Sequence, residues 1–298
     1  MTGKLRSFGV PILFSFLAFL SGCGSSTPKS CLGTCTLQPT EFLYAPGGNG
    51  ISSFTLSTAG VPTPLGNQAA PNESEGIVVD PSAKFLYVSD FANGSVDAFT
   101  INATSGGLTV VPGSPFLVFL AGSASGGIAV DPSTKFLYVT LVNVPAVAAF
   151  SINSSSGALT AVPGSPFATG NTPFQVITDP SGKFLYVSNL NDSQGAISAY
   201  TIDSTSGALT PVLGSPFSTQ SNFPGPNAGS PFAVLTGPDA LTVDPTGAFL
   251  YVADSSSSGG DISVFSISAA TGVLTAIGGS PFSTGPQSLI GLAIAKTH

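Results

Sequence analysis

The chain has 298 residues, of which 7% are charged, and its formal net charge is −7. Nucleic-acid binding depends on Lys and Arg side chains that neutralise phosphates, so seven basic residues against fourteen acidic ones exclude a nucleic acid as partner. With so few charges the surface consists mainly of Ser, Thr, Asn, Gln and Gly, and such a neutral polar surface suits a glycan or a protein ligand.

Residues 1–22 are expected to be a cleaved export signal. Lys4 and Arg6 precede an apolar run over residues 10–20, which is too short to span a bilayer comfortably. The run ends in Leu-Ser-Gly followed by Cys23, which resembles the lipobox of bacterial lipoproteins. The resemblance implies cleavage before Cys23, acylation of this cysteine and a lipid anchor in the cell envelope, expected in the outer membrane. An ordinary signal peptide and an uncleaved anchor are the alternatives.

Residues 23–40 are expected to form a lipidated linker. Cleavage removes two basic residues and no acidic one, so five Lys against fourteen acidic residues leave the mature chain with a net charge of −9. In an oxidising envelope Cys31 and Cys35 are expected to form a local disulfide, with two free thiols as the alternative. Zinc would need further ligands, and the single histidine of the chain is His298, so no zinc site is expected.

A repeat dominates residues 41–298 and predicts their fold. The pattern Asp-Pro-Ser/Thr-x-Lys/Ala-Phe-Leu-Tyr-Val begins at Asp80, Asp131, Asp179 and Asp244. A partial fifth copy, Glu-Phe-Leu-Tyr-Ala, begins at Glu41. The interval before Asp244 is longer than the others, but residues 218–237 hold no further Phe-Leu-Tyr segment and are expected to form an enlarged loop.

Each unit is expected to contain four antiparallel strands. In the first complete unit these are residues 76–79, 85–88, 95–101 and 108–111, and Gly-Ser-Pro-Phe at 113–116 is expected to close the unit. The second strand is apolar at every position, which indicates that neighbouring units cover both of its faces. Gly and Pro are too frequent to leave room for a helix, so the domain is predicted to be all-β.

Repeated four-stranded units of this kind predict a five-bladed β-propeller, with a solenoid as the alternative. The first copy lacks its innermost strand, whereas the end of the chain, residues 288–295, resembles such a strand without the rest of a unit. We therefore expect residues 289–295 to pair with the strand at 42–45. This pairing would close the ring and leave no open sheet edge.

These motifs resemble those of the β-propeller lactonases, whose members include 6-phosphogluconolactonase-like enzymes. The resemblance covers nearly all of the chain from Glu41 and rests on the repeated Asp-Pro-Ser segment, the Ser-Gly-Ala-Leu-Thr hairpins at 156–160 and 206–210, and Gly-Ser-Pro-Phe. It implies a propeller, generally of seven blades, that hydrolyses lactones with His, Arg and Glu at the mouth of its central channel.

The chain departs from this pattern in blade number and in catalytic groups. It shows five units, no Arg after cleavage of the signal, and one histidine as its last residue. A lactonase needs a base to activate water and a group that stabilises the oxyanion. Carboxylates would supply the base here, and backbone N–H groups or a bound metal would have to stabilise the oxyanion.

The Asp residues of the repeated turn are interpreted as structural. Each precedes Pro, and in three of the four units a Lys follows four residues later, which favours turn capping and local charge pairing over a ring of metal ligands. The Tyr residues of Phe-Leu-Tyr are expected to pack between blades; they are Tyr87, Tyr138, Tyr186 and Tyr251.

Loops that enter the innermost strands are predicted to line the mouth of the channel. Together with the loops that follow the second strands they supply six candidate ligand-binding residues: Glu73, Glu75, Asp90, Phe174, Asp239 and Asp254. Glu75 and Asp239 are the catalytic candidates, because both flank the closed blade and form a carboxylate pair suited to a glycoside or a lactone. The same pair would suit Ca²⁺, which prefers oxygen ligands. The alternative is that both are solvated loop charges.

From the sequence alone we expect an exported, lipid-anchored propeller that binds a glycan or a protein without catalysis. The channel mouth and residues 218–237 would form its binding surface. Lactone hydrolysis is the alternative function, and the lack of Arg and His in the mature chain before His298 favours binding over catalysis.

Overall fold

A computed structural model describes residues 41–47, 50–57, 60–68, 74–118, 124–190, 196–219, 235–256, 259–284, 289 and 292–294. The predicted signal peptide, the lipidation site Cys23, the pair Cys31 and Cys35, and most of the loop at 218–237 lie outside these ranges. The described residues form strands β1 to β23 and no helix, as predicted. Accordingly, none of them belongs to a helix long and apolar enough to cross a membrane.

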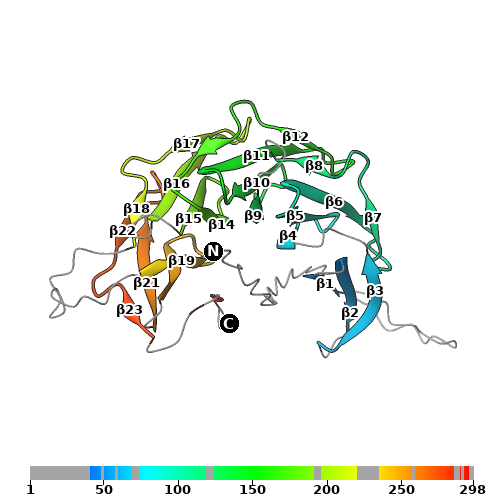
Figure 1. The fold of residues 1–298 in the computed structure, drawn as a ribbon, viewed down its shortest axis with the longest axis horizontal. Coiled ribbons are helices and arrows are strands. Elements are labelled where there is room, and N and C mark those ends of the chain that lie inside the picture. The colour runs from blue at the N-terminus through cyan, green and yellow to red at the C-terminus, as the bar shows by residue number, and fades with distance from the viewer. Residues whose placement is uncertain are drawn as a thin grey trace, which may run out of the picture.

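The strands form five antiparallel sheets, which are the blades of a propeller (Figure 1). Blade 1 contains β1 (Glu41–Gly47), β2 (Gly50–Leu56) and β3 (Pro62–Gln68). Blade 2 contains β4 (Ser74–Val79), β5 (Phe85–Asp90), β6 (Ser95–Ile101), β7 (Leu108–Val110) and β8 (Phe116–Leu117). Blade 3 contains β9 (Ser125–Val130), β10 (Phe136–Leu141), β11 (Ala146–Ile152), β12 (Leu159–Ala161) and β13 (Phe167–Ala168).

Blade 4 contains β14 (Pro173–Thr178), β15 (Phe184–Asn189), β16 (Ala196–Ile202), β17 (Leu209–Pro211) and β18 (Phe217–Ser218). Blade 5 contains β19 (Leu235–Val243), β20 (Phe249–Ser256), β21 (Gly259–Ile267), β22 (Leu274–Ala276) and β23 (Phe282–Ser283). The predicted four-strand order is confirmed in blades 2 to 5, and the first copy of the repeat begins at the second strand of a blade, also as predicted. The five blades follow one another along an arc, with blades 1 and 5 at its two ends (Figure 1).

Gly-Ser-Pro-Phe does not end the unit; it bridges a break in the outer strand. In blade 3 the two halves, β12 and β13, both pair with β11. At the break, the Ser165 hydroxyl oxygen accepts the backbone N–H of Ala149 at 2.9 Å and so replaces a missing strand carbonyl. The same bond recurs between Ala98 and Ser114, Ala199 and Ser215, and Val264 and Ser280. A hydrogen bond that spans two strands is not visible in the repeat pattern, and the short fifth strand was therefore missed.

Replacing this serine should destabilise the blade measurably. Ser165→Ala leaves the N–H of the fully buried Ala149 without an acceptor, which is expected to cost about 1–3 kcal/mol in the free energy of unfolding. Urea denaturation of Ser165→Ala and of the control Ser154→Ala, at an exposed hairpin position, measures the difference. Equal stabilities of the two variants would contradict this role.

The turn Asp caps its own turn, as the sequence indicated. Oδ1 of Asp131 accepts the backbone N–H groups of Lys135 at 2.8 Å and of Phe136 at 2.7 Å. Its Oδ2 accepts the N–H of Ser133 at 3.0 Å and also the hydroxyl of that residue. Lys135 thus contributes its backbone N–H to the turn, which hydrogen bonds to the Asp131 carboxylate hold together.

The same contact recurs at the four interfaces between neighbouring blades. In blade 3 the Tyr138 hydroxyl donates to the carbonyl oxygen of Gly207 in blade 4 at 3.1 Å, and the Phe136 ring lies directly against Gly207. The corresponding pairs are Tyr44 with Gly106 (2.8 Å), Tyr87 with Gly157 (3.0 Å) and Tyr186 with Gly272 (3.3 Å). Burial raises the pKa of Tyr138, so the phenol keeps the proton that it donates. The prediction that these tyrosines pack between blades is confirmed for Tyr87, Tyr138 and Tyr186.

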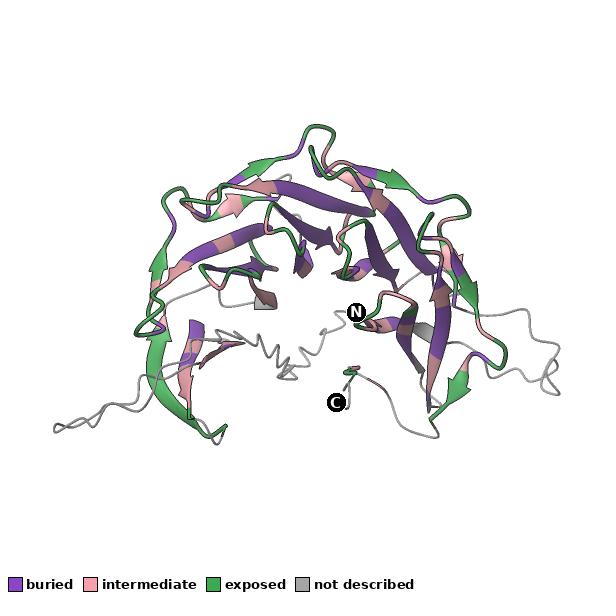
Figure 2. Cartoon of the chain, turned by 180° about the vertical axis from the view of Figure 1, so that it is seen from behind, coloured by how far each residue is buried: buried purple, intermediate pink, exposed green. Residues whose placement is uncertain are grey.

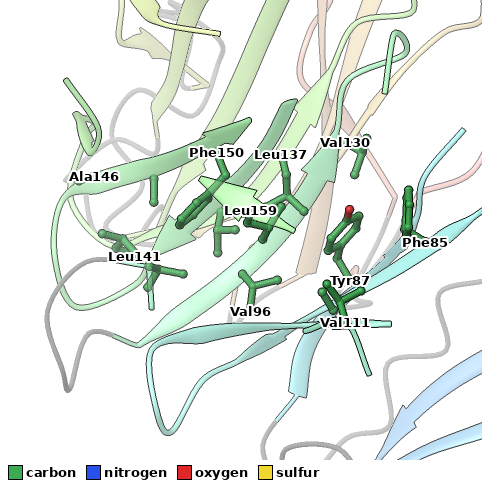
Figure 3. Close-up of a cluster of buried hydrophobic side chains, with 14 residues drawn as sticks. Phe85, Tyr87, Val96, Val111, Val130, Leu137, Leu141, Ala146, Phe150 and Leu159 are labelled. Atoms are coloured by element: carbon green, nitrogen blue, oxygen red, sulfur yellow. The ribbon is translucent and has the colours of Figure 1, made fainter. Parts of the chain in front are cut away.

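Apolar side chains fill the space between blades around this contact. Figure 3 shows the cluster between blades 2 and 3, in which Phe85 and Val96 of one blade face Leu137 and Phe150 of the next. Colouring by burial shows the same pattern along the arc: the central strands are buried and the outer strands exposed (Figure 2). Both faces of each central strand in blades 2 to 4 are therefore covered, as its apolar sequence predicted.

Blade 5 differs from blades 2 to 4 because no described blade packs against the face that would meet the next blade along the arc. Phe249 is 38% exposed, whereas the equivalent Phe136 is 4% exposed. Phe249 and Tyr251 line an open groove together with Ile262, Val264, Ile277 and Phe282. The expectation that Tyr251 packs between blades is therefore wrong.

The predicted closure of the ring is also not found. Leu289 and Leu292–Ile294 are the described residues of the expected closing strand, and they belong to no strand. In the described sheet of blade 1, β1 pairs only with β2. The pairing would require blades 1 and 5 to be adjacent, but they lie at opposite ends of the arc (Figure 1).

Candidate functional site

Acidic side chains gather at one end of the blades. The central strands of the blades, such as β5 and β20, start beside the Asp-Pro turns and finish at this end. Strand pairing places five acidic residues there, and we call this the acidic end: Asp90, Asp97, Asp239, Asp254 and Asp261. It corresponds to the face that the sequence predicted as the mouth of the channel.

Blade 5 brings three of these residues together on adjacent strands. Asp254 in β20 lies directly opposite Asp261 in β21. On its other side Asp254 pairs with Pro238 in β19, and Asp239 follows at a register shift of this pairing. Asp239 and Asp261 are half-buried, whereas Asp254 is only 1% exposed.

The surroundings of Asp254 bring the pKa of its carboxyl group close to neutral pH. Burial raises its pKa to about 7; hydrogen bonds from Ser263 and Thr219 oppose the shift, and the charges of Asp261 and Asp239 add to it. Oδ2 accepts the Ser263 hydroxyl at 2.5 Å. Oδ1 is buried and has no hydrogen-bond partner in the described part of the chain. A carboxyl group that titrates near pH 7 is suited to general acid–base catalysis.

A second acidic pair lies in blade 2. Burial raises the pKa of Asp97 to about 6, and the charge of Asp90 adds to the shift. Asp90 itself is 3% exposed and accepts hydrogen bonds from the backbone N–H (3.1 Å) and the side-chain amide (2.6 Å) of Asn93. These bonds give Asp90 a structural task in the loop, so blade 5 offers the better catalytic carboxyl group.

The structure assembles only part of the predicted site. Asp239 and Asp254 lie close together at the acidic end of blade 5. Glu75 lies in β4 of blade 2, so the expected catalytic pair of Glu75 with Asp239 is separated by blades 3 and 4 along the arc (Figure 1). Phe174 contributes its backbone, because its carbonyl oxygen accepts the Thr140 hydroxyl at 2.8 Å.

Two predictions remain untested. Glu73 lies outside the described residues. The described residues contain no group of three or more His, Cys, Asp or Glu side chains that could hold a metal ion. The calcium hypothesis relied on Glu75, whose side chain is outside the description, and it stays a hypothesis.

Sequence reasoning missed Asp97 and Asp261. Both lie in the third strand of a blade, near its start, where antiparallel pairing sets them opposite the end of the second strand. An acidic residue in an otherwise apolar alternating strand was the available signal. This signal did not lead to a site prediction, because only loop residues were expected to reach the mouth of the channel.

Comparison with known proteins supports the lactonase-like fold. The family model for "Lactonase, 7-bladed beta-propeller" matches residues 114–222. No curated protein matches the chain.

Several solved structures share the fold. A Bacteroides fragilis protein with a proposed 6-phosphogluconolactonase activity has a TM-score of 0.68 and 19% identity, over 86% of this chain and 70% of that one. The periplasmic gluconolactonase of Pseudomonas aeruginosa has a TM-score of 0.64 and 17% identity, over 83% and 68%. A Lactobacillus plantarum protein has a TM-score of 0.62 and 21% identity, over 82% and 69%. The chain is thus similar to the β-propeller lactonases, in sequence over residues 114–222 and in fold over most of its length.

Proposed function

We propose that this chain hydrolyses lactones and that Asp254 is its general base. The observation that carries the proposal is the buried Asp254, which has a pKa of about 7 and one carboxyl oxygen without a partner among the described residues. The similarity to the lactonase family supports lactones as the substrate class. The proposal replaces the sequence-based preference for a non-catalytic binding module. That preference rested on the lack of Arg and His in the mature chain, whereas Asp254 is a carboxyl group suited to act as the base.

The proposed reaction needs one base and one positioned water molecule. Above its pKa, ionised Asp254 accepts a proton from the water, whose oxygen forms a bond with the carbonyl carbon of the lactone. The bond between that carbon and the ring oxygen then breaks, and the ring oxygen takes the proton back from Asp254. Lactone and water thus give a hydroxy acid, and Asp254 returns to its starting state.

Neighbouring groups would orient the substrate and the base. Asp239 and Asp261 are half-buried beside Asp254, so their carboxylates can accept hydrogen bonds from hydroxyl groups of a polyhydroxy lactone. The Ser263 hydroxyl, at 2.5 Å from Oδ2, fixes the orientation of the Asp254 carboxyl group. Backbone N–H groups are the donors that remain for the oxyanion.

The test is hydrolysis of a lactone panel as a function of pH. Because only ionised Asp254 acts as base, kcat/KM should rise with pH and level off above an inflection near pH 7. The release of acid from five- and six-membered sugar lactones is followed in a pH-stat, with the spontaneous hydrolysis subtracted at each pH. Absence of turnover above this background from pH 5 to 9 would refute the proposal.

A further inference from the structure

The two ends of the blades differ in their charged side chains. The end with the proposed site carries acidic residues and no lysine among the described residues, whereas the opposite end carries three lysines together with the turn Asp residues. Asp239, Asp254 and Asp261 occupy adjacent strands of blade 5, and blade 2 adds Asp90 and Asp97 at the same end. A ligand that reaches Asp254 from this end therefore approaches several carboxylates.

The lysines of the described residues lie at the opposite end. Lys84, Lys135 and Lys183 each stand directly before a central strand, namely β5, β10 or β15. Such a six-residue strand spans about 20 Å, which exceeds the screening length of about 8 Å at physiological ionic strength. The lysine charges are therefore screened from the acidic end. The remaining basic residues of the sequence are Lys4, Arg6, Lys29 and Lys296, all outside the described ranges.

Phosphate groups are bound in proteins by Arg, Lys or helix N-termini, and the described residues around Asp254 offer carboxylates instead. We infer that the site selects an uncharged polyhydroxy lactone and rejects a phosphorylated one. This inference rests on the proposed function and adds the substrate class. Hydroxyl groups donate to Asp239 and Asp261, whereas a phosphate dianion in the same place meets like charge.

The experiment compares two lactones that differ only in a phosphate group. For the full chain, kcat/KM for glucono-δ-lactone should exceed that for its 6-phosphate by about 100-fold at low ionic strength. In about 0.5 M NaCl the ratio should fall, because salt screens charge repulsion.

Two variants locate the origin of the selectivity. Asp261→Asn removes a half-buried carboxylate opposite Asp254 and should lower the ratio by about tenfold, mainly by improving the phosphorylated substrate. Asp203→Asn removes an equal charge from an exposed hairpin at the lysine-bearing end and should leave the ratio unchanged.

The outcomes separate the selectivity from the activity. Equal or faster hydrolysis of the 6-phosphate overturns the selectivity and leaves lactone hydrolysis intact. A selectivity that persists in high salt and in Asp261→Asn contradicts its electrostatic origin. Absence of turnover with the entire lactone panel overturns the proposed function and this inference with it.

Discussion

Asp254→Asn is expected to abolish most of the lactone hydrolysis and at the same time to stabilise the fold. Asn has no proton-accepting carboxylate, so kcat/KM should fall by about 10²–10⁴-fold, which is the usual contribution of a general base. The loss should appear mainly in kcat, because the neighbouring Asp239 and Asp261 still bind the substrate.

The gain in stability follows from the raised pKa. Burial lifts the pKa of Asp254 from 3.8 to about 7, so the folded state favours the protonated form. The stability this provides is complete below pH 4 and is lost as the pH rises through 7. Asn is uncharged at every pH, so at pH 8 the variant should be more stable than the native chain by up to about 4 kcal/mol.

Urea denaturation at pH 4 and pH 8, measured alongside kinetics, tests both effects. The free energy of unfolding of Asp254→Asn should exceed that of the native chain at pH 8 and equal it at pH 4. Asp203→Asn is the control, because its carboxyl group is exposed and because Asn already caps the equivalent hairpins at Asn102 and Asn153. A variant that loses activity and stability together at pH 8 would show that Asp254 is structural rather than catalytic.

Gly207→Ala is expected to destabilise the chain by about 3–5 kcal/mol, and Gly60→Ala by only about 1–2 kcal/mol. Both glycines directly precede the residue that closes a hairpin and have a φ of 75°, so a methyl group strains both backbones to a similar degree. At Gly207 the added Cβ would lie 2.4 Å from the Phe136 ring, whereas nothing lies within 4 Å of it at Gly60.

The difference between these two variants measures the contact between blades. Both variants and the native chain are denatured in urea at the same pH. If the slope of the transition is unchanged, the shift in its midpoint gives the loss of stability for each variant. Equal losses would mean that the hairpin of blade 1 is covered in solution as closely as that of blade 4. That result would contradict the open arc in which Phe249 is exposed.

The repeat unit could be predicted well because its signals are local. Asp131 bonds to backbone groups within five residues, so the turn is encoded in the segment that forms it. The alternation of polar and apolar residues and the short apolar runs are also local signals, and they predicted the strands that pair within a blade. The Ser165 bond to Ala149 joins residues sixteen positions apart, and its motif was accordingly assigned to the end of the unit.

The candidate site was predicted less completely than the fold. The sequence indicated Asp239 and Asp254 on one face, but it assigned Asp239 to a pair with Glu75 across a closed blade. That pair would form only if blades 1 and 5 met and closed the ring, and they lie at opposite ends of the arc. Asp261, by contrast, lies seven residues from Asp254 and was missed, because its position depends on the register between β20 and β21.

The sequence by itself determined the all-β class, the blade unit and the similarity to propeller lactonases, and the export signal stays a prediction. Only the tertiary structure decided that blades 1 and 5 do not meet and that Asp254 is buried beside two further carboxyl groups. The physical reason is that strand patterns and turn capping are short-range, whereas burial and pKa shifts arise from charges and surfaces that the fold brings together.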